Sequence, residues 1–297
     1  MQISETQNGE LLVVVKALVS SISPILIVFA LSSVGPFASL AMSNFFAVLF
    51  FASLLTLKGK WQEVFKKSLF LDGLAAAVFI GLGLYGLYFY GLKFTTAGNA
   101  SIIVLMEIFF SYLFFNVWKK EDFSKTHALG ALLMVVGALL VLFPKSNTTS
   151  FNTGDLLILC AVAFGPMGNY FQQKLRKKVS TDSALFIRYL LSLPLVCLLA
   201  IIFKEMPSAE SLLKSLPYLL IFGLVMLGAN NILWLEAIHR ISVTKAISLV
   251  SLSPFFTLLF AYFLLKEVPG PWQLLSLVPL GLGVRLLTKK NPTTMVE

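Results

Sequence analysis

Glu107 is a carboxylate near the middle of a long apolar stretch, which runs over residues 97–118. In a helix that rises about 1.5 Å per residue, it lies roughly 15 Å from either end of this stretch. An ionised carboxylate at that depth in a bilayer is costly unless it is paired, hydrated or protonated. We therefore predict that Glu107 takes up a proton or attracts a cationic or zwitterionic solute. The alternatives are a structural ion pair, for which Lys16 is a candidate, and a permanently neutral acid.

Helix-breaking residues occur at matching places in the two halves of the chain. The segment Ser20–Pro24, with the sequence SSISP, shifts by 145 positions onto Gly165–Asn169, with the sequence GPMGN. Loosened backbone is tolerated in lipid only where it lines a cavity, so paired interruptions indicate a transport site. Two independent packing kinks are the alternative. Lys16 shares one helix face with Ser20 and Ser23, and it either lines the same cavity or extends its ammonium to the interface.

Other polar side chains lie at mid-membrane positions on neighbouring spans. Amides and hydroxyls there can bind a small polar solute, while aromatic faces pack against its apolar part. Hydrogen bonds between helices, worth about 0.6 kcal/mol on average, are the alternative. We predict no catalytic, cofactor-binding or metal-binding residue. The predicted substrate-binding residues are Ser20, Ser23, Tyr85, Tyr88, Glu107, Ser111, Asn169, Tyr170, Asn230, Asn231, Trp234 and Ser253.

The elements that position these residues are apolar helices. The 297 residues are 58% hydrophobic and only 12% charged, whereas soluble domains carry about 25% charged residues. Apolar runs of the length that crosses a bilayer, about 20 residues, recur from end to end. Strand-type alternation is absent from the sequence, which argues against a membrane β-barrel. The ten predicted spans are Leu11–Leu31, Gly35–Leu57, Ser68–Leu92, Ala97–Trp118, His127–Phe143, Gly154–Gln173, Asp182–Phe203, Leu216–Ile238, Val243–Leu265 and Gly270–Leu287.

The two halves of the chain align with each other. Residues Leu82–Gly137 shift by 146 positions onto Gly228–Gly283 without a gap, which pairs Gly137 with Gly283. Each half holds an odd number of predicted spans, so the second copy inserts upside down relative to the first. Inverted repeats are typical of transporters, because oppositely oriented halves can rock about a shared site. The predicted fold is an all-α membrane protein of ten transmembrane helices in two inverted five-helix repeats. Its segments are an N-terminus (1–10), a first repeat (11–143), an external linker (144–153), a second repeat (154–288) and a C-terminus (289–297).

The net charge of +9 follows the predicted topology. If the N-terminus is cytoplasmic, sixteen Lys and Arg residues lie on the cytoplasmic side and five on the other. Such a bias is the positive-inside rule, and it places both termini in the cytoplasm. A nucleic-acid partner is therefore not needed to explain the basic balance.

The order of short motifs resembles the drug/metabolite transporter superfamily, of the EamA-like type. The motifs are a TTAGNA segment (Thr95–Ala100) entering the fourth span, Lys-Glu pairs closing the fourth and ninth spans at 120–121 and 266–267, Ser253-Pro254 in the ninth span, and Gly154-Asp155 opening the second half. The chain departs from the pattern with Ile108 after Glu107 and with Met42 where many members have arginine, whereas Arg188 keeps that arginine in the second half. The resemblance implies export or exchange of small metabolites, amino acids or drugs, with no cofactor.

We predict a secondary transporter of the cytoplasmic membrane that moves a small organic metabolite, amino-acid-like or drug-like, by alternating access, as export or exchange. Its predicted partners are this small-molecule substrate and the lipid bilayer, with no nucleic acid, and the sequence leaves a homodimer open. The alternative is a channel or a non-transporting subunit of a larger complex. An enzyme is not predicted, because the central acid has no nearby histidine in the spans to work with.

Overall fold

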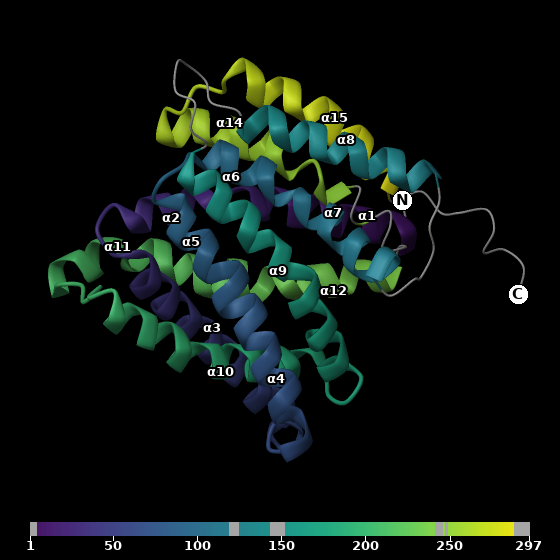
Figure 1. Cartoon of the computed structure of the whole chain (residues 1–297). Coiled ribbons are helices and arrows are strands. Elements are labelled where there is room, and N and C mark those ends of the chain that lie inside the picture. The colour runs from purple at the N-terminus through teal and green to yellow at the C-terminus, as the bar shows by residue number, and fades with distance from the viewer. Residues whose placement is uncertain (1–4, 119–124, 143–151, 241–245, 247–248, 288–297) are drawn as a thin grey trace, which may run out of the picture. The chain divides into compact units, whose positions relative to one another are not determined.

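The computed structural model describes residues 5–118, 125–142, 152–240, 246 and 249–287, and within these ranges it contains helices and no strands. Residues 289–297 and most of the predicted linker 144–153 lie outside the described residues. The elements, labelled as in Figure 1, are α1 (Glu5–Ser21), α2 (Ser23–Leu31), α3 (Pro36–Lys58), η1 (Trp61–Glu63), η2 (Lys67–Leu69), α4 (Phe70–Ala76), η3 (Ala77–Gly86), α5 (Leu87–Leu92), α6 (Ala97–Val104), α7 (Met106–Tyr112), η4 (Leu113–Trp118), α8 (Lys125–Leu142), α9 (Thr153–Arg176), α10 (Thr181–Ile202), α11 (Ala209–Ile221), η5 (Phe222–Ala229), α12 (Asn230–Arg240), α14 (Ser253–Leu265) and α15 (Pro271–Leu287).

Seven helical stretches in the described residues are long and apolar enough to cross a membrane. They are Gln7–Leu31, Pro36–Lys58, Lys67–Leu92, Ala97–Phe115, Thr153–Arg176, Thr181–Ile202 and Ala209–Trp234. Each coincides with a predicted span, so the all-helical membrane fold is confirmed. The three other predicted spans fall on the shorter apolar helices Thr126–Leu142, Ser253–Leu265 and Pro271–Leu287. The count of ten spans therefore stays a prediction.

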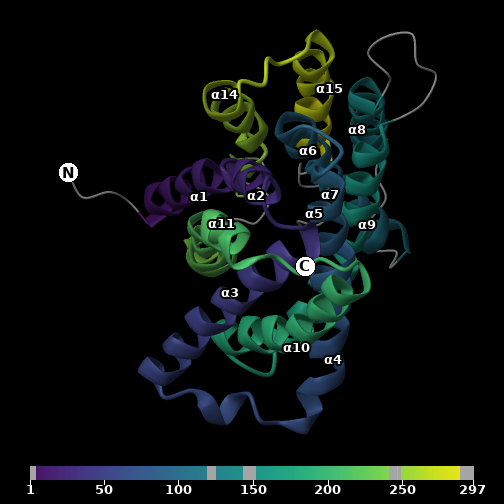
Figure 2. The same cartoon turned by 90° about the vertical axis from the view of Figure 1, so that its left-hand side faces the viewer.

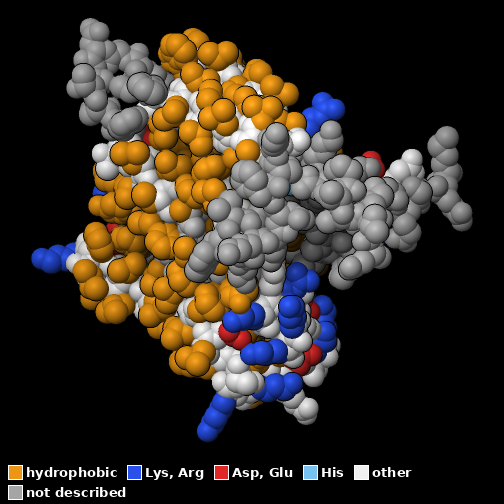
Figure 3. All heavy atoms as spheres, turned by 45° about the vertical axis from the view of Figure 1, so that its right-hand side comes forward, with side chains coloured by type: hydrophobic (Ala, Val, Ile, Leu, Met, Phe, Trp, Pro, Cys, Tyr) orange, Lys and Arg blue, Asp and Glu red, His pale blue; other side chains and the backbone are white. Residues whose placement is uncertain are grey.

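Apolar side chains cover wide areas of the surface (Figure 3). Leu132 and Val136 on α8 and Leu274 and Val278 on α15 are all exposed. Contiguous exposed apolar surface of this kind is rare on water-soluble monomers and is stable in contact with lipid. Charged side chains gather instead at the lower end of the view in Figure 3.

The chain forms two compact units, and each draws segments from both halves of the sequence. Unit 1 comprises Met1–Ile25, Thr95–Leu156 and Asn230–Glu297. Unit 2 comprises Leu26–Phe94 and Leu157–Ala229.

In unit 2, α3 packs against α10. The segment after each of these helices carries a glutamate that caps the start of the other helix. Glu205, which follows α10, accepts a hydrogen bond of 2.7 Å from the backbone N–H of Phe37 at the start of α3. Glu63, which follows α3, accepts hydrogen bonds from the N–H of Ser180 (2.8 Å) and from the hydroxyls of Ser180 (2.6 Å) and Ser183 (2.7 Å) at the start of α10. Each carboxylate thus satisfies N–H groups that a helix leaves unpaired and lies at the positive end of a helix dipole.

We expect the Glu63 cap to stabilise the protein at neutral pH and to lose this stabilising effect at acid pH. The hydrogen bonds from Ser180 and Ser183 lower the pKa of Glu63 from 4.5 to about 2. A carboxylate whose folded pKa is depressed contributes stability above the unfolded pKa and loses it as the pH falls toward the folded pKa. Glu63→Gln should therefore lower the free energy of unfolding by about 1 kcal/mol at pH 7, and its difference from the unmodified chain should shrink below pH 4.5.

Thermal unfolding of the detergent-solubilised protein from pH 7 to pH 3 measures this difference. The matched control is Glu210→Gln, which removes an exposed carboxylate that only pairs with Lys214 one turn away on the same helix. A Glu63→Gln variant whose deficit is constant across this pH range would contradict the cap.

In unit 1, α8 and α15 pack along their lengths, and Figures 1 and 2 both show them side by side. Their contacts are reciprocal under the shift of 146. A Cβ at Gly137 would lie 2.4 Å from the Cγ of Leu280, and a Cβ at Gly283 would lie 2.8 Å from the Cγ of Met134. A Cβ at Gly283 would also lie 2.8 Å from the backbone oxygen of Gly130. The glycines therefore permit a close approach of two backbones, as small residues do in membrane helix pairs.

A buried polar network joins the start of α6 to α9 and α15 within unit 1. The carboxylate of Asp155, which is 2% exposed, accepts hydrogen bonds from the Thr95 hydroxyl and from the Asn99 amide. The Gln273 amide donates to the Oδ1 of Asn99 over 2.6 Å. Glu267 accepts from the first two backbone N–H groups of α6, over 3.2 and 3.3 Å. Glu267, the acid at the end of the ninth predicted span, thus caps the start of α6.

Two long π-helical segments occupy matching positions in unit 2. They are η3 (Ala77–Gly86) and η5 (Phe222–Ala229), whose starts differ by 145 residues. The π-helix is rare and is often found at functional sites. The candidate residue Tyr85 lies in η3.

Candidate functional site

The predicted interruption of the first span is confirmed, and its predicted counterpart is not. Helix α1 ends at Ser21, and α2 begins at Ser23, so the break falls within the segment Ser20–Pro24. In the second half, α9 continues from Thr153 to Arg176 with Pro166 inside it. The prediction of a break at Gly165–Asn169 is therefore wrong. An internal proline removes one hydrogen bond and can be accommodated by a kink without ending the helix.

Matching interruptions occur instead in the fourth and ninth predicted spans, both in unit 1. Leu105 separates α6 from α7, with hydrogen bonds from Leu105 N–H to the Ile102 oxygen and from Ile108 N–H to the Leu105 oxygen, both 3.1 Å. The same pair of short-range bonds recurs 147 residues later around Leu252, over 3.2 and 3.1 Å, just before α14. Mid-helix turns of this type often mark functional hinges. Glu107 lies two residues after the first of them.

A polar cluster lies beside the first interruption. The Nδ2 of Asn230 donates a hydrogen bond of 2.8 Å to the Oγ of Ser20, and the Nζ of Lys16 donates to the same oxygen over 3.5 Å. The Nζ of Lys16 also lies 5.2 Å from the ring centre of Trp234. A cation over an aromatic ring is attracted by about 0.5–2 kcal/mol, more when it is desolvated. Two helices from opposite halves of the chain, α1 and α12, thus position these four side chains.

This cluster retains groups for binding a ligand. Asn230 is 9% exposed, and its Oδ1 has no hydrogen-bond partner among the described residues. A buried amide oxygen without a partner is costly, so it is an acceptor position that a ligand could satisfy. The Oγ of Ser20 accepts from both Asn230 and Lys16, which directs its own proton elsewhere.

Side chains of α14 bind backbone oxygens at the interruption of the first span. The hydroxyl of Thr257 donates to the oxygen of Ser21 (3.0 Å), and that of Ser253 donates to the oxygen of Ala17 (3.3 Å). The end of a helix leaves carbonyl oxygens unpaired, and α14 satisfies one of them. The predicted residue Ser253 is therefore engaged in holding the interruption in place.

Lys16 and Glu107 attract each other electrostatically. The ammonium of Lys16 does not extend to the interface, since it bonds Ser20 one turn further into the span. From the sequence, Lys16 could either line the cavity or extend its ammonium to the interface, and Lys16 was not among the predicted binding residues. Its signal is a lysine on the same face of an apolar helix as Ser20 and Ser23. A carboxylate and an ammonium in the same unit each lower the cost of the other in lipid.

The structure divides the predicted binding residues between the two units. Unit 1 contains Ser20, Ser23, Glu107, Ser111, Asn230, Asn231, Trp234 and Ser253, and unit 2 contains Tyr85, Tyr88, Asn169 and Tyr170. Within unit 1, hydrogen bonds and the cation–π contact bring together Ser20, Asn230 and Trp234 around Lys16. Ser23, Ser111 and Asn231 are half-buried on α2, α7 and α12.

In unit 2, the four predicted residues are half-buried on η3, α5 and α9. The face of the Tyr170 ring is covered by the ammonium of Lys174, 4.7 Å from its centre. Arg188 was not predicted, although a charge within a span is the same signal that singled out Glu107. It is 4% exposed, its Nη1 donates to Gln172 over 2.6 Å, and its Nη2 has no partner among the described residues.

A family model matches nearly the whole chain. The model of the EamA-like transporter family aligns twice, with residues 7–143 and with residues 152–289. The chain belongs to the EamA-like transporter family. It is therefore a multi-pass membrane protein of a transporter family and not an enzyme.

Curated relatives of this EamA-like chain carry the same general description. An "Uncharacterized transporter" of Methanothermobacter thermautotrophicus is 28% identical over 240 residues, which cover 77% of this chain and 68% of the relative. "Uncharacterized transporter YoaV" of Bacillus subtilis is 26% identical over 196 residues, or 64% of this chain and 66% of the relative. A third, from Archaeoglobus fulgidus, is 35% identical over 137 residues, or 46% and 40%. The aligned part thus spans about two thirds of the first two relatives and less of the third.

A solved structure shares the fold of this EamA-like chain. It is described only as "Crystal structure of protein", and it matches with a TM-score of 0.64 and 15% sequence identity over 96% of both chains.

Proposed function

We propose that this EamA-like chain is a secondary transporter that moves a small zwitterionic organic metabolite across the cytoplasmic membrane by alternating access, as export or exchange. The observation that carries the proposal is the cluster of Lys16, Ser20, Asn230 and Trp234, with Glu107 as the charge that balances Lys16. Polar and charged groups are costly in apolar spans and are typical of substrate and ion pathways.

The proposed architecture is ten spans in two inverted repeats, 11–143 and 154–288, with both termini in the cytoplasm. Three features support it. The interruptions at Leu105 and Leu252 match, the π-helices η3 and η5 match, and the glycine contacts of α8 and α15 are reciprocal. Matching interrupted helices in the two halves of a transporter are the best indication of its binding site.

The chemistry of the cluster favours a zwitterion. The Lys16 ammonium and the Ser20 hydroxyl are donors for a carboxylate, while the Asn230 Oδ1 is an acceptor for an ammonium. Glu107 adds the negative charge that an ammonium group prefers. The ring of Trp234 can pack against an apolar substituent. In this proposal, Glu107 is also the group that takes up a proton if transport is coupled to one.

Counterflow in reconstituted vesicles tests the transport proposal. A thermal-shift screen of amino acids, nucleosides, polyamines and organic acids first selects a solute, because ligands that bind the folded state raise its Tm. Vesicles preloaded with that solute should then accumulate the labelled form transiently and with saturable kinetics. Flux that rises linearly with concentration indicates a channel, and absence of flux indicates a non-transporting subunit, and either result contradicts the proposal.

A further inference from the structure

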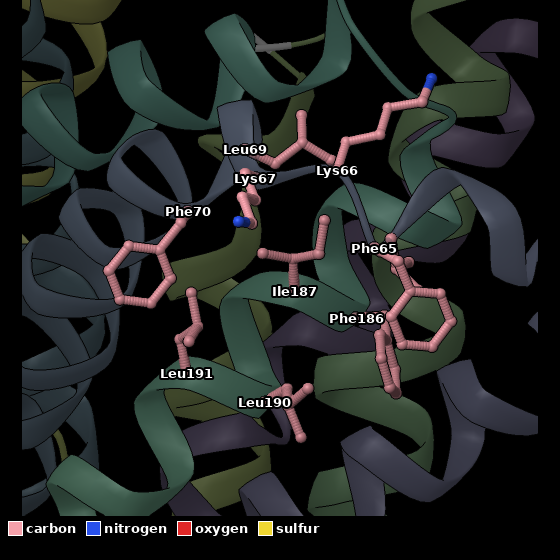
Figure 4. Close-up of a pocket in the computed structure, with 10 residues that line it drawn as sticks. Phe65, Lys66, Lys67, Leu69, Phe70, Phe186, Ile187, Leu190 and Leu191 are labelled. Carbon is pink, nitrogen blue, oxygen red and sulfur yellow. The ribbon is translucent and has the colours of Figure 1, made fainter.

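Unit 2 contains an apolar groove of about 490 Å³ between the loop that precedes α4 and the first turns of α10. Its volume falls within the range of small-molecule sites, about 300–1,000 Å³. We call it the α4–α10 groove, and Figure 4 shows the side chains that line it. The apolar lining residues include Phe65, Phe70, Phe186, Ile187, Leu190 and Leu191.

The groove lies where a membrane span begins. The apolar stretch Lys67–Leu92 starts at its edge, and α10 enters its own apolar stretch at Thr181. Trp61 packs edge-on against Phe186 with ring centres 5.3 Å apart, and tryptophans are enriched at the boundary between lipid and water. Phe65 is 78% exposed and Phe70 53%. Apolar side chains this open at the edge of the hydrocarbon are in position to contact a lipid chain.

The rim of the groove carries two lysines that no described side chain neutralises. Lys66 and Lys67 are exposed, and their ammonium groups make no hydrogen bond or ion pair within the described residues. Figure 4 shows the ammonium of Lys67 turned toward the space between Phe70 and Ile187, while Lys66 extends outward. An occupant that pairs with Lys67 therefore also lies against the apolar lining.

The neighbouring acids are already engaged. Glu63 accepts the hydrogen bonds that cap α10. Asp72 pairs with Lys178 over 2.7 Å, and Asp182 pairs with Lys58 over 2.6 Å. The positive charge of Lys66 and Lys67 can therefore be balanced by an anionic ligand.

We propose that the α4–α10 groove binds an anionic phospholipid, with an acyl chain against the apolar lining and the phosphate of the headgroup on Lys67 and Lys66. A lipid of the surrounding leaflet reaches a groove at the start of a span without crossing water. Anionic headgroups are attracted to lysines beside a membrane span, whereas a zwitterionic lipid would leave the net charge of the rim unbalanced. The site lies within unit 2 and is independent of the proposed transport cluster.

Native mass spectrometry of the full chain in detergent, titrated with phosphatidylglycerol or phosphatidylcholine, tests the site. We expect phosphatidylglycerol to bind more tightly and to raise the Tm more. Lys66→Gln with Lys67→Gln should weaken its binding roughly fivefold for each lysine, the factor that one lysine contributes near an anionic membrane surface. Lys177→Gln, an exposed lysine outside the groove, removes the same charge and should change nothing.

A second pair of variants tests the apolar part. Leu190→Trp places a large ring in the groove and should displace the lipid while leaving both lysines in place. Leu198→Trp is the control, since it lies two turns further along α10, is similarly exposed and does not line the groove. Equal binding of the two lipids, unchanged binding in the lysine or Leu190 variants, or an equal Tm shift from inorganic phosphate alone would each overturn the proposal.

Discussion

Replacing Glu107 with glutamine is expected to reduce substrate counterflow at least about 20-fold. The change keeps the shape of the side chain and removes the negative charge that is proposed to bind the substrate and to act electrostatically on Lys16. If Glu107 pairs with the ammonium group of the substrate, as proposed, loss of that charge pair costs about 2–5 kcal/mol, and every 1.4 kcal/mol is about tenfold in affinity. The initial rate of counterflow at limiting solute concentration, normalised to the amount of folded transporter in the vesicles, measures the loss. Glu210→Gln, which removes an exposed carboxylate on α11, should transport normally.

A double variant distinguishes a substrate role of Glu107 from a structural one. In the single variant, Lys16 loses its counter-charge, which lowers stability as well as transport. Combining Glu107→Gln with Lys16→Met removes both charges, so thermal stability should return toward that of the unmodified chain. If the pair binds substrate, counterflow stays low in the double variant. Recovery of both stability and counterflow would contradict the role proposed for Glu107.

The interruptions in the spans show how far sequence reasoning reaches. The break in the first span was predictable, because Pro24 has no backbone N–H to continue a helix that comes before it and is well tolerated in the first turn of a new helix, where it lies in α2. Pro166 has the same local signal, yet α9 continues through it. The break at Leu105 has no glycine or proline beside it. Packing and the pairing of backbone groups within each unit decide these outcomes, and a local sequence pattern does not reveal them.

Contacts between distant loops were also beyond the sequence. Glu63 and Ser180 are separated by 117 residues, and Glu205 and Phe37 by 168. The acids were visible as charges near the ends of spans, but their partners depend on the packing of α3 against α10. Asn230 was predicted from its type and depth in a span, and the structure adds its bond to Ser20. Type and depth are properties of one segment, whereas a partner is a property of the fold.

Regular and irregular helices have different roles in the proposed mechanism. The pairs α3–α10 and α8–α15 have capped ends or close backbone contacts, which resist deformation. Interrupted or π-helical backbone carries Ser20 and Tyr85 and lies beside Glu107. Hinges are a few element-terminal positions that absorb backbone change between rigid parts. In the proposed mechanism, the rigid helix pairs are therefore as necessary as the polar cluster.

Replacing Gly283 with leucine is expected to abolish the packing of α8 against α15. Even a Cβ at this position would lie 2.8 Å from the backbone oxygen of Gly130, and backbone cannot move aside as a side chain can. Gly283→Ala, the smaller change, should cost about 1–3 kcal/mol and lower the Tm by roughly 3–10 °C. Thermal unfolding followed by size-exclusion chromatography in detergent measures the Tm and, for Gly283→Leu, the loss of monodisperse protein.

Gly281, on the same helix, is the control that separates the effect of the close contact at Gly283 from the effect of helix propensity. Gly281 has no atom within 4 Å of where its Cβ would lie, so a larger side chain there meets open space. Glycine to alanine inside a helix gains about 0.5–1 kcal/mol by propensity at either position. Gly281→Ala should therefore be neutral or stabilising, and Gly281→Leu should remain monodisperse. If the variants at 281 and 283 unfolded at the same temperature, close approach of α8 and α15 through Gly283 would not be what holds this pair together.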